Sequence, residues 1–102
     1  MRVRAALEQV FLERRSGGIE ALLVFERESG ARERSSLTLA SFELPVAAGL
    51  LGRILARRDD VADVARCRVR VQRGAALSDD VRLRDTLRAA FREERRRLQD
   101  AA

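Results

Sequence analysis

The sequence contains no histidine, lysine, asparagine, tyrosine or tryptophan, and it has one cysteine, Cys67. Without histidine, a zinc site would have to rely on carboxylate ligands, which is unusual for that metal. General acid–base catalysis would fall to Asp, Glu or Arg, because the usual imidazole is missing. A lone cysteine cannot form an internal disulfide. These absences argue against most classes of enzyme, and we expect no catalytic residues, no metal and no cofactor.

Long apolar runs are also missing. No segment approaches the roughly 20 apolar residues that a membrane-spanning helix needs. The N-terminal segment is interrupted by Glu8 and Glu13, so it lacks the apolar core and cleavage site of a secretory signal. With 46% hydrophobic and 36% charged residues, the chain has a globular composition. We therefore expect one small cytoplasmic domain that covers residues 1–102.

Arginine is what the chain has in abundance, and all 21 basic residues are arginine. A GC-rich bacterial genome explains arginine in place of lysine, but it does not explain where the charge lies. Residues 1–64 hold ten arginines and ten acidic residues, whereas residues 65–102 hold eleven arginines and six acidic residues. The net charge of +5 therefore belongs to the last third of the chain, which predicts a localised basic patch.

The spacing of apolar residues predicts the order of the elements. Helical spacing predicts a first helix over 2–15, and alternation predicts a hairpin of strands over 19–28 and 32–39. Further segments are a helix over 41–58, a strand over 64–72 and a helix over 79–99. The predicted fold is a single α+β domain of order α-β-β-α-β-α, in which a three-stranded sheet carries helices packed on one face.

Charge pairing predicts the register of the hairpin. A three-residue loop over 29–31 places Glu28 opposite Arg32 and Glu26 opposite Arg34, whereas a two-residue loop would oppose like charges. Opposite charges across a strand pair are favourable by roughly 0.2–1 kcal/mol. The charges therefore favour the three-residue loop.

The two later helices have predicted starts and buried faces. Ser41 is the predicted N-cap of the helix over 41–58, and Ser78 that of the last helix. The buried faces are predicted to consist of Val46, Ala47, Leu50, Leu51, Ile54 and Leu55 in the first of these, and of Leu83, Leu87, Ala90, Phe91 and Leu98 in the second. Small residues at 48, 52 and 56, on the face of the helix over 41–58 opposite its buried face, would allow another backbone to come close.

Arginines alternate with apolar residues in the strand over 64–72. Arg66, Arg68 and Arg70 would lie on one face, about 6.6 Å apart, while Cys67 and Val69 face the core. This spacing is similar to that of phosphates along a nucleic acid, which suggests contacts to the backbone of RNA. The same alternation is also typical of a half-buried strand whose arginines face water or acidic neighbours.

Two apolar residues, Leu22 and Val24, lie on the outer face of the strand over 19–28. The neighbouring positions are Glu and Arg, and the sequence supplies no second layer for that face unless the last helix crosses it. An apolar pair inside a charged ring suits contact with another protein chain, although single exposed apolar residues are also common.

The Gly49-Leu50-Leu51-Gly52 segment resembles the GxxG of the type II KH fold, which clamps a nucleic-acid backbone. In element order, the likeness covers residues 2–72. It is similar to the variant of a bacterial ribosome-maturation factor, in which a small-residue kink replaces the GxxG. The resemblance implies RNA binding.

Two functions follow as expectations. The first is a non-catalytic interaction or assembly domain that docks to itself or to a larger complex through an open sheet face. Its contact residues are Leu22, Val24, Arg66, Arg68 and Arg70. The alternative is a small basic RNA- or ribosome-binding domain. Its contact residues are Arg66, Arg68, Arg70, Arg73, Arg88 and Arg92.

Overall fold

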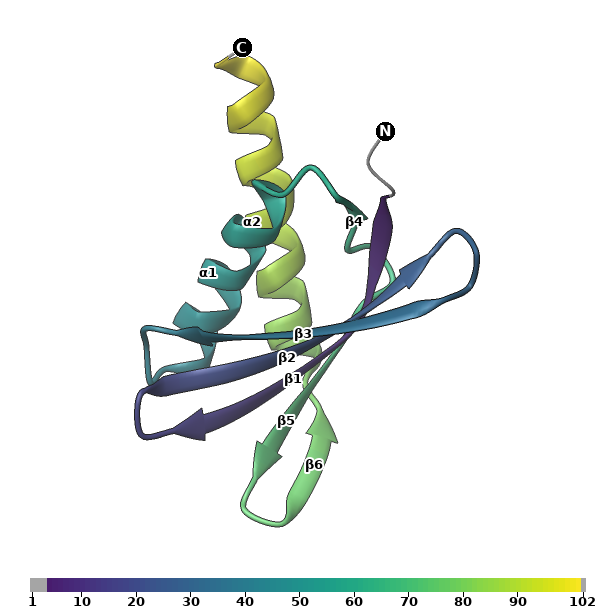
Figure 1. Cartoon of the computed structure of the whole chain (residues 1–102). Coiled ribbons are helices and arrows are strands. Elements are labelled where there is room, and N and C mark those ends of the chain that lie inside the picture. The colour runs from purple at the N-terminus through teal and green to yellow at the C-terminus, as the bar shows by residue number, and fades with distance from the viewer. Residues whose placement is uncertain (1–3, 102) are drawn as a thin grey trace.

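The computed structural model describes residues 4–101, which form six strands and two helices (Figure 1). In chain order these are β1 (Ala5–Arg15), β2 (Gly18–Arg27), β3 (Arg32–Leu39), α1 (Leu44–Ala56), β4 (Val61–Asp63), β5 (Arg68–Arg73), β6 (Ala76–Asp79) and α2 (Val81–Asp100). The predicted order α-β-β-α-β-α with a three-stranded sheet is therefore wrong. The fold is α+β, but its order is β-β-β-α-β-β-β-α.

The six strands form one mixed sheet in the order β3-β2-β1-β5-β6, and the short β4 pairs with the start of β1. β1 is central, antiparallel to β2 and parallel to both β4 and β5. Both helices lie on the same side of this sheet, as Figure 1 shows. We call the side away from the helices the open face.

A β-bulge explains why the first element was predicted as a helix. Leu7 pairs with Phe25 and Gln9 pairs with Val24, so Glu8 is an extra residue in β1. On either side of the bulge, successive side chains of β1 alternate between the core and the open face. The extra residue sets Leu7 and Val10, both buried against the helices, three positions apart. Three is a helical spacing, so the interrupted alternation of a strand resembles helical periodicity.

The hairpin of β2 and β3 is confirmed, but its predicted register is wrong. Glu26 lies opposite Arg32, and the Arg27 N–H donates to the carbonyl of Ala31, which leaves 28–30 as the loop. This loop places Gly30 in its last position with φ of +87°, a conformation that favours glycine. The glycine determines the register, and an opposite-charge pair still forms diagonally between Arg27 and Glu33.

The two helices run in the same direction and pack closely at Gly52. A Cβ built there would lie 2.9 Å from the Cβ of Ala90 and well inside contact distance of the Leu87 carbonyl oxygen. Ala48 and Ala56, on the same side of α1, are also buried. Another backbone does come close along this small-residue face, and it is α2 of the same chain. The predicted position of the face is wrong, because it belongs to the core and does not lie opposite it.

This contact rotates α1 relative to its predicted buried face. Val46 and Ile54 are 47% and 41% exposed, because small residues rather than these larger ones face α2. The helix also begins later than predicted. Its N-cap is Glu43, and the hydroxyl of Ser41 accepts a hydrogen bond from the Glu43 N–H at 3.1 Å.

The predicted strand over 64–72 begins only at Arg68, because residues 65 and 66 form a turn. Sequence reasoning missed β6, whose four residues are all exposed and show no apolar alternation. α2 consequently starts after Asp80, which caps it by accepting a hydrogen bond from the Leu83 N–H at 3.0 Å. Leu98, predicted to face inward, is 42% exposed.

The resemblance to the type II KH fold is not supported by this topology. A KH-like order needs a helix before β2 and two helices between β3 and the next strand. Residues 5–15 form a strand instead, and α1 continues unbroken through the Gly49–Gly52 segment.

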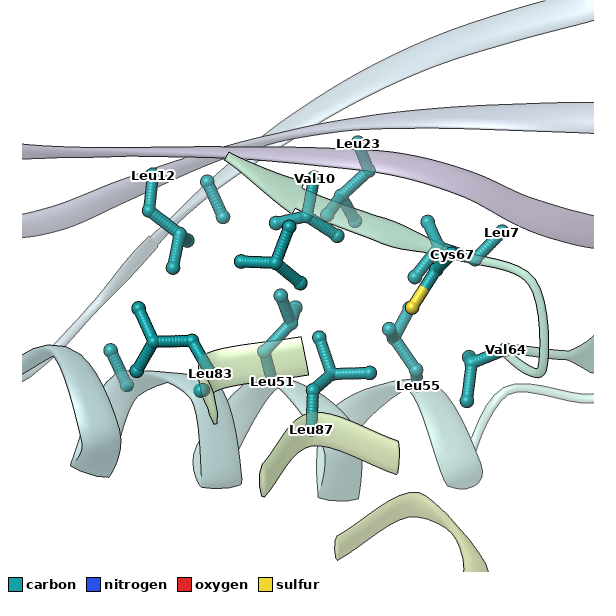
Figure 2. Packing of buried hydrophobic residues seen from close by; sticks show 14 of the residues in the cluster. Leu7, Val10, Leu12, Leu23, Leu51, Leu55, Val64, Cys67, Leu83 and Leu87 are labelled. Atoms are coloured by element: carbon teal, nitrogen blue, oxygen red, sulfur yellow. The ribbon is translucent and has the colours of Figure 1, made fainter. Parts of the chain in front are cut away.

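The core fills the space between the sheet and the two helices (Figure 2). Leucines 7, 12 and 23 point from the sheet toward α1 and α2. Cys67 is 1% exposed within this core, as predicted, and burial raises the pKa of its thiol. Neither helix of residues 4–101 is long and apolar enough to cross a membrane.

The helix contact predicts opposite effects for two glycines of α1. Gly52→Ala should lower the free energy of unfolding by about 1–3 kcal/mol, because the new methyl group collides with α2. Gly49→Ala should raise it by about 0.5–1 kcal/mol, because a Cβ there meets nothing within 4 Å and alanine favours the helix. Urea denaturation measures both, and equal effects would contradict this packing.

Candidate interaction surface

The register of the sheet places the outward side chains of the open face in rows. One row crosses β3, β2, β1, β5 and β6 and contains, in that order, Ser36, Leu22, Phe11, Arg70 and Asp79. The next row contains Arg34, Val24, Gln9 and Arg68. Nothing within residues 4–101 forms a second layer over these rows, because both helices lie on the other side.

The middle of the open face is apolar. Phe11 and Leu22 are half-buried, and Val24 is 8% exposed although it belongs to the uncovered side. We call these three residues the apolar strip. They line an open depression of about 440 Å³ together with neighbouring polar side chains. Long side chains shield the strip, and the guanidinium of Arg70 lies 6.0 Å from the ring centroid of Phe11.

On the β5 side, two arginines share one carboxylate. Arg68 donates to Asp79 of β6 at 2.9 Å, and the Nε of Arg70 lies 3.5 Å from the same carboxylate. Because these ion pairs are exposed to solvent, they contribute little to the stability of the fold. Their effect is on the surface charge, because the group of three carries one net positive charge.

On the β3 side, the arginines differ from each other. Arg32 donates to Glu8 at 2.9 Å, and this hydrogen bond holds the pKa of Glu8 below its usual value. The bulge makes the pair possible, because it turns Glu8 toward the open face. Arg34 is exposed and has no ion pair with any residue between 4 and 101.

Acidic residues lie at the two ends of the apolar strip. Glu8 and Glu26 lie at one end, near Arg32. Glu13 and Glu20 lie opposite each other at the far end, 3.2 Å and 3.7 Å from Arg15. The open face thus has an apolar centre, positive sides and mainly negative ends.

The structure brings together four of the five residues predicted for a protein contact. Leu22, Val24, Arg68 and Arg70 all lie on the open face. Arg66 does not belong to this row of arginines, because it lies in the turn before β5. There it lines a second depression of about 510 Å³, which extends to Glu8 and Glu26 at one end of the open face.

The arginines predicted for RNA binding do not form one surface. Arg73 pairs with Asp80 at 3.2 Å, near the end of the β5–β6 hairpin. Arg88 of α2 donates to the carbonyl of Cys67 at 3.3 Å. Arg92 is exposed on α2, in the layer on the other side of the sheet from Arg68 and Arg70.

Several arginines of the basic last third have structural roles. Arg95 donates to the carbonyls of Ala56, Arg58 and Val61 at 2.8, 3.1 and 2.7 Å. It therefore holds the end of α1 and the following loop against α2, and burial lowers the pKa of its guanidinium. Arg97 pairs with the buried carboxylate of Glu94 at 3.2 Å, and Arg57 at the end of α1 pairs with the same carboxylate at 2.7 Å. Basic residues at helix C-termini are also favoured by the helix dipole.

Sequence reasoning missed Phe11, Arg34 and Asp79 as members of the open face. Phe11 was assigned to the apolar side of a helix that does not exist. Asp79 was assigned to the start of α2, which hid its pairing with Arg68 and Arg70. The alternation of β1 would have revealed Phe11 only if the bulge had been recognised.

Comparison with protein-family models, with curated proteins and with solved structures finds no match for this chain. Among residues 4–101, no group of three or more Asp, Glu or Cys side chains is arranged to hold a metal ion. The function must therefore be argued from the open face itself.

The two faces of β2 predict different roles for neighbouring leucines. Leu23 is 0% exposed, so Leu23→Ala should lower the free energy of unfolding by about 2–5 kcal/mol. Leu22→Ala should cost less than about 1 kcal/mol, because its side chain is half-buried on the open face and does not belong to the core. Denaturant unfolding compares the two variants, and a large loss for both would mean that the open face is part of the core.

Proposed function

We propose that this protein is a non-catalytic interaction domain that docks to another protein through the open face. The observation that carries the proposal is the apolar strip, which no helix covers and which long polar side chains shield only in part, between arginines of β3 and of β5. A small domain that needed this surface only for solubility would have polar residues in the middle positions.

The composition of the open face supports a protein contact. The fully buried centre of a protein interface is enriched in aromatic residues and arginine, and its rim is polar. Here Phe11, Leu22 and Val24 supply the apolar centre, and flexible charged side chains surround it. Arg70 beside the Phe11 ring is an arrangement that a partner could bury without losing the cation–π contact.

The RNA alternative has weaker support on the same surface. Phosphate binding needs several uncompensated positive charges along one track. Asp79 already offsets Arg68 and Arg70, and acidic residues lie at both ends of the strip. The chain also lacks the tyrosine and tryptophan on which single-stranded binders commonly stack bases.

Salt dependence tests the RNA alternative. Under our proposal, replacing Arg68→Gln and Arg70→Gln together should leave the affinity for a single-stranded RNA homopolymer and its salt dependence unchanged. If both arginines contacted phosphates, the slope of log affinity against log salt would fall by about 1.4, or about 0.7 per contact. Fluorescence anisotropy at several salt concentrations measures this slope. The pair Arg82→Gln and Arg96→Gln, two exposed arginines of α2, is the matched control, and a fall confined to the β5 pair would contradict the proposal.

Cross-linking from two adjacent serines tests the protein contact. Ser36 pairs with Leu22 on the open face, whereas Ser35 pairs with Leu23 and belongs to the covered face. Both serines are exposed. A photoreactive amino acid at position 36, in cells that produce the protein naturally, should give a discrete adduct with one protein identifiable by mass spectrometry. Position 35 should not give that adduct, and nucleic-acid adducts or equal yields from both positions would overturn the proposal.

A further inference from the structure

The charge pattern of the open face specifies more than the presence of a partner. This inference rests on the proposed function and concerns the shape and chemistry of that partner. The apolar strip runs along β1 and β2. Arg32 and Arg34 of β3 form one flank, and Arg68 and Arg70 of β5 form the other.

The distance between the flanks matches the width of a helix. β3 and β5 are three strand spacings apart, or roughly 14 Å at about 4.8 Å per spacing. An α-helix with its side chains is about 10–12 Å across. A helix lying along β1 and β2 would therefore cover the strip and reach both flanks with its lateral side chains.

We infer that the open face binds an amphipathic α-helix of a partner protein, with an apolar stripe flanked on both sides by acidic residues. The stripe packs on Phe11, Leu22 and Val24. The acidic residues face Arg34 on one side and Arg68 and Arg70 on the other. Of these arginines, Arg34 is the one without an ion pair to any residue in 4–101, so it gains the most from a new acidic partner.

The length of the strip limits the contact to a short helix. The strip occupies two rows, which are two residues or about 7 Å apart along the strands. Allowing for the width of the side chains, this corresponds to about two or three helical turns at 5.4 Å per turn. Beyond that length, the partner would meet the acidic residues Glu13 and Glu20 at one end and Glu8 and Glu26 at the other.

A second copy of this chain does not fit the pattern. α1 has no acidic residue, and α2 has seven arginines against four acidic residues, so neither helix offers acidic flanks. Two copies could pack their open faces together about a two-fold axis. If that axis ran parallel to the strands, Arg34 of one copy would lie close to Arg68 of the other. If it ran perpendicular to the strands within the plane of the interface, the acidic ends of the two copies would meet, and in both cases like charges oppose association.

A pair of designed peptides tests the inference with the full chain. The first peptide has a central segment, Glu-Leu-Ala-Ala-Leu-Glu-Gln-Glu-Leu, which places leucines on one face and glutamates on both sides of it over about two and a half turns. Uncharged turns of Ala and Gln extend the helix at both ends. The second has lysine in place of every glutamate. Fluorescence anisotropy at low salt should show that the glutamate peptide binds at least about tenfold more tightly, and high salt should reduce this difference.

Charge reversal on both flanks provides the decisive variant. Arg34→Glu with Arg68→Glu changes two exposed residues at the ends of one row. This variant should lose the glutamate peptide and gain affinity for the lysine peptide, a reversal that general destabilisation could not produce. Arg82→Glu with Arg92→Glu, which changes two exposed arginines of α2, should leave both affinities unchanged. Circular dichroism establishes that each variant is folded.

The outcomes separate this inference from the proposed function. Equal binding of the two peptides, or binding of neither, overturns the acidic helix, while a protein adduct from position 36 would still support docking. If the photoreactive residue at position 36 of the otherwise unchanged chain gives no protein adduct, the proposed function itself is overturned. A wild-type dimer that the flank reversal dissociates, or RNA that displaces the glutamate peptide from the strip, would also overturn the inference.

Discussion

The close contact between α1 and α2 at Gly52 determines how the rest of the molecule is arranged. Because the backbone of α2 occupies the space of a missing side chain, the two helices lie side by side in one layer. That layer covers the core on one side of the sheet. Within residues 4–101 no further helix remains for the other side, so the central strands keep an uncovered face. The open face is therefore a consequence of helix packing. Its apolar strip lies where no helix of residues 4–101 is left to cover the sheet.

Net charge is a poor guide to the proposed interaction surface of this protein. The excess of arginine in the last third lies largely on α2, where Arg95 binds carbonyls at the end of α1 and Arg97 pairs with Glu94. The open face is close to neutral, because Asp79 and the glutamates offset its arginines. What distinguishes it is the order of the charges, positive along two sides and negative at the ends, around an apolar centre. A partner would be selected by that pattern rather than by attraction at long range.

The parts of the fold that follow regular periodicity could be predicted, and the parts set by irregular features could not. The outward placement of Leu22 follows from simple alternation in β2, and the buried position of Cys67 from the alternation of β5 continued to the residue before it. The bulge at Glu8 hid β1, and with it Phe11. The glycine in the loop of the β2–β3 hairpin outweighed the charge pairs that were used to predict the register. The buried face of α1 was misjudged because large apolar residues were expected to face the core, whereas contact with another helix favoured the smallest ones.

The bulge has a consequence for how the length of this chain can change. Glu8 and Gln9 both belong to the open side, so removing Glu8 would leave Leu7, Gln9 and Val10 in strict alternation. Every core residue of β1 would keep its side of the sheet. A deletion at Phe11 would instead move each later or each earlier residue of the strand to the opposite side. Position 8 is thus a place in β1 where the gain or loss of one residue alters the surface and spares the interior.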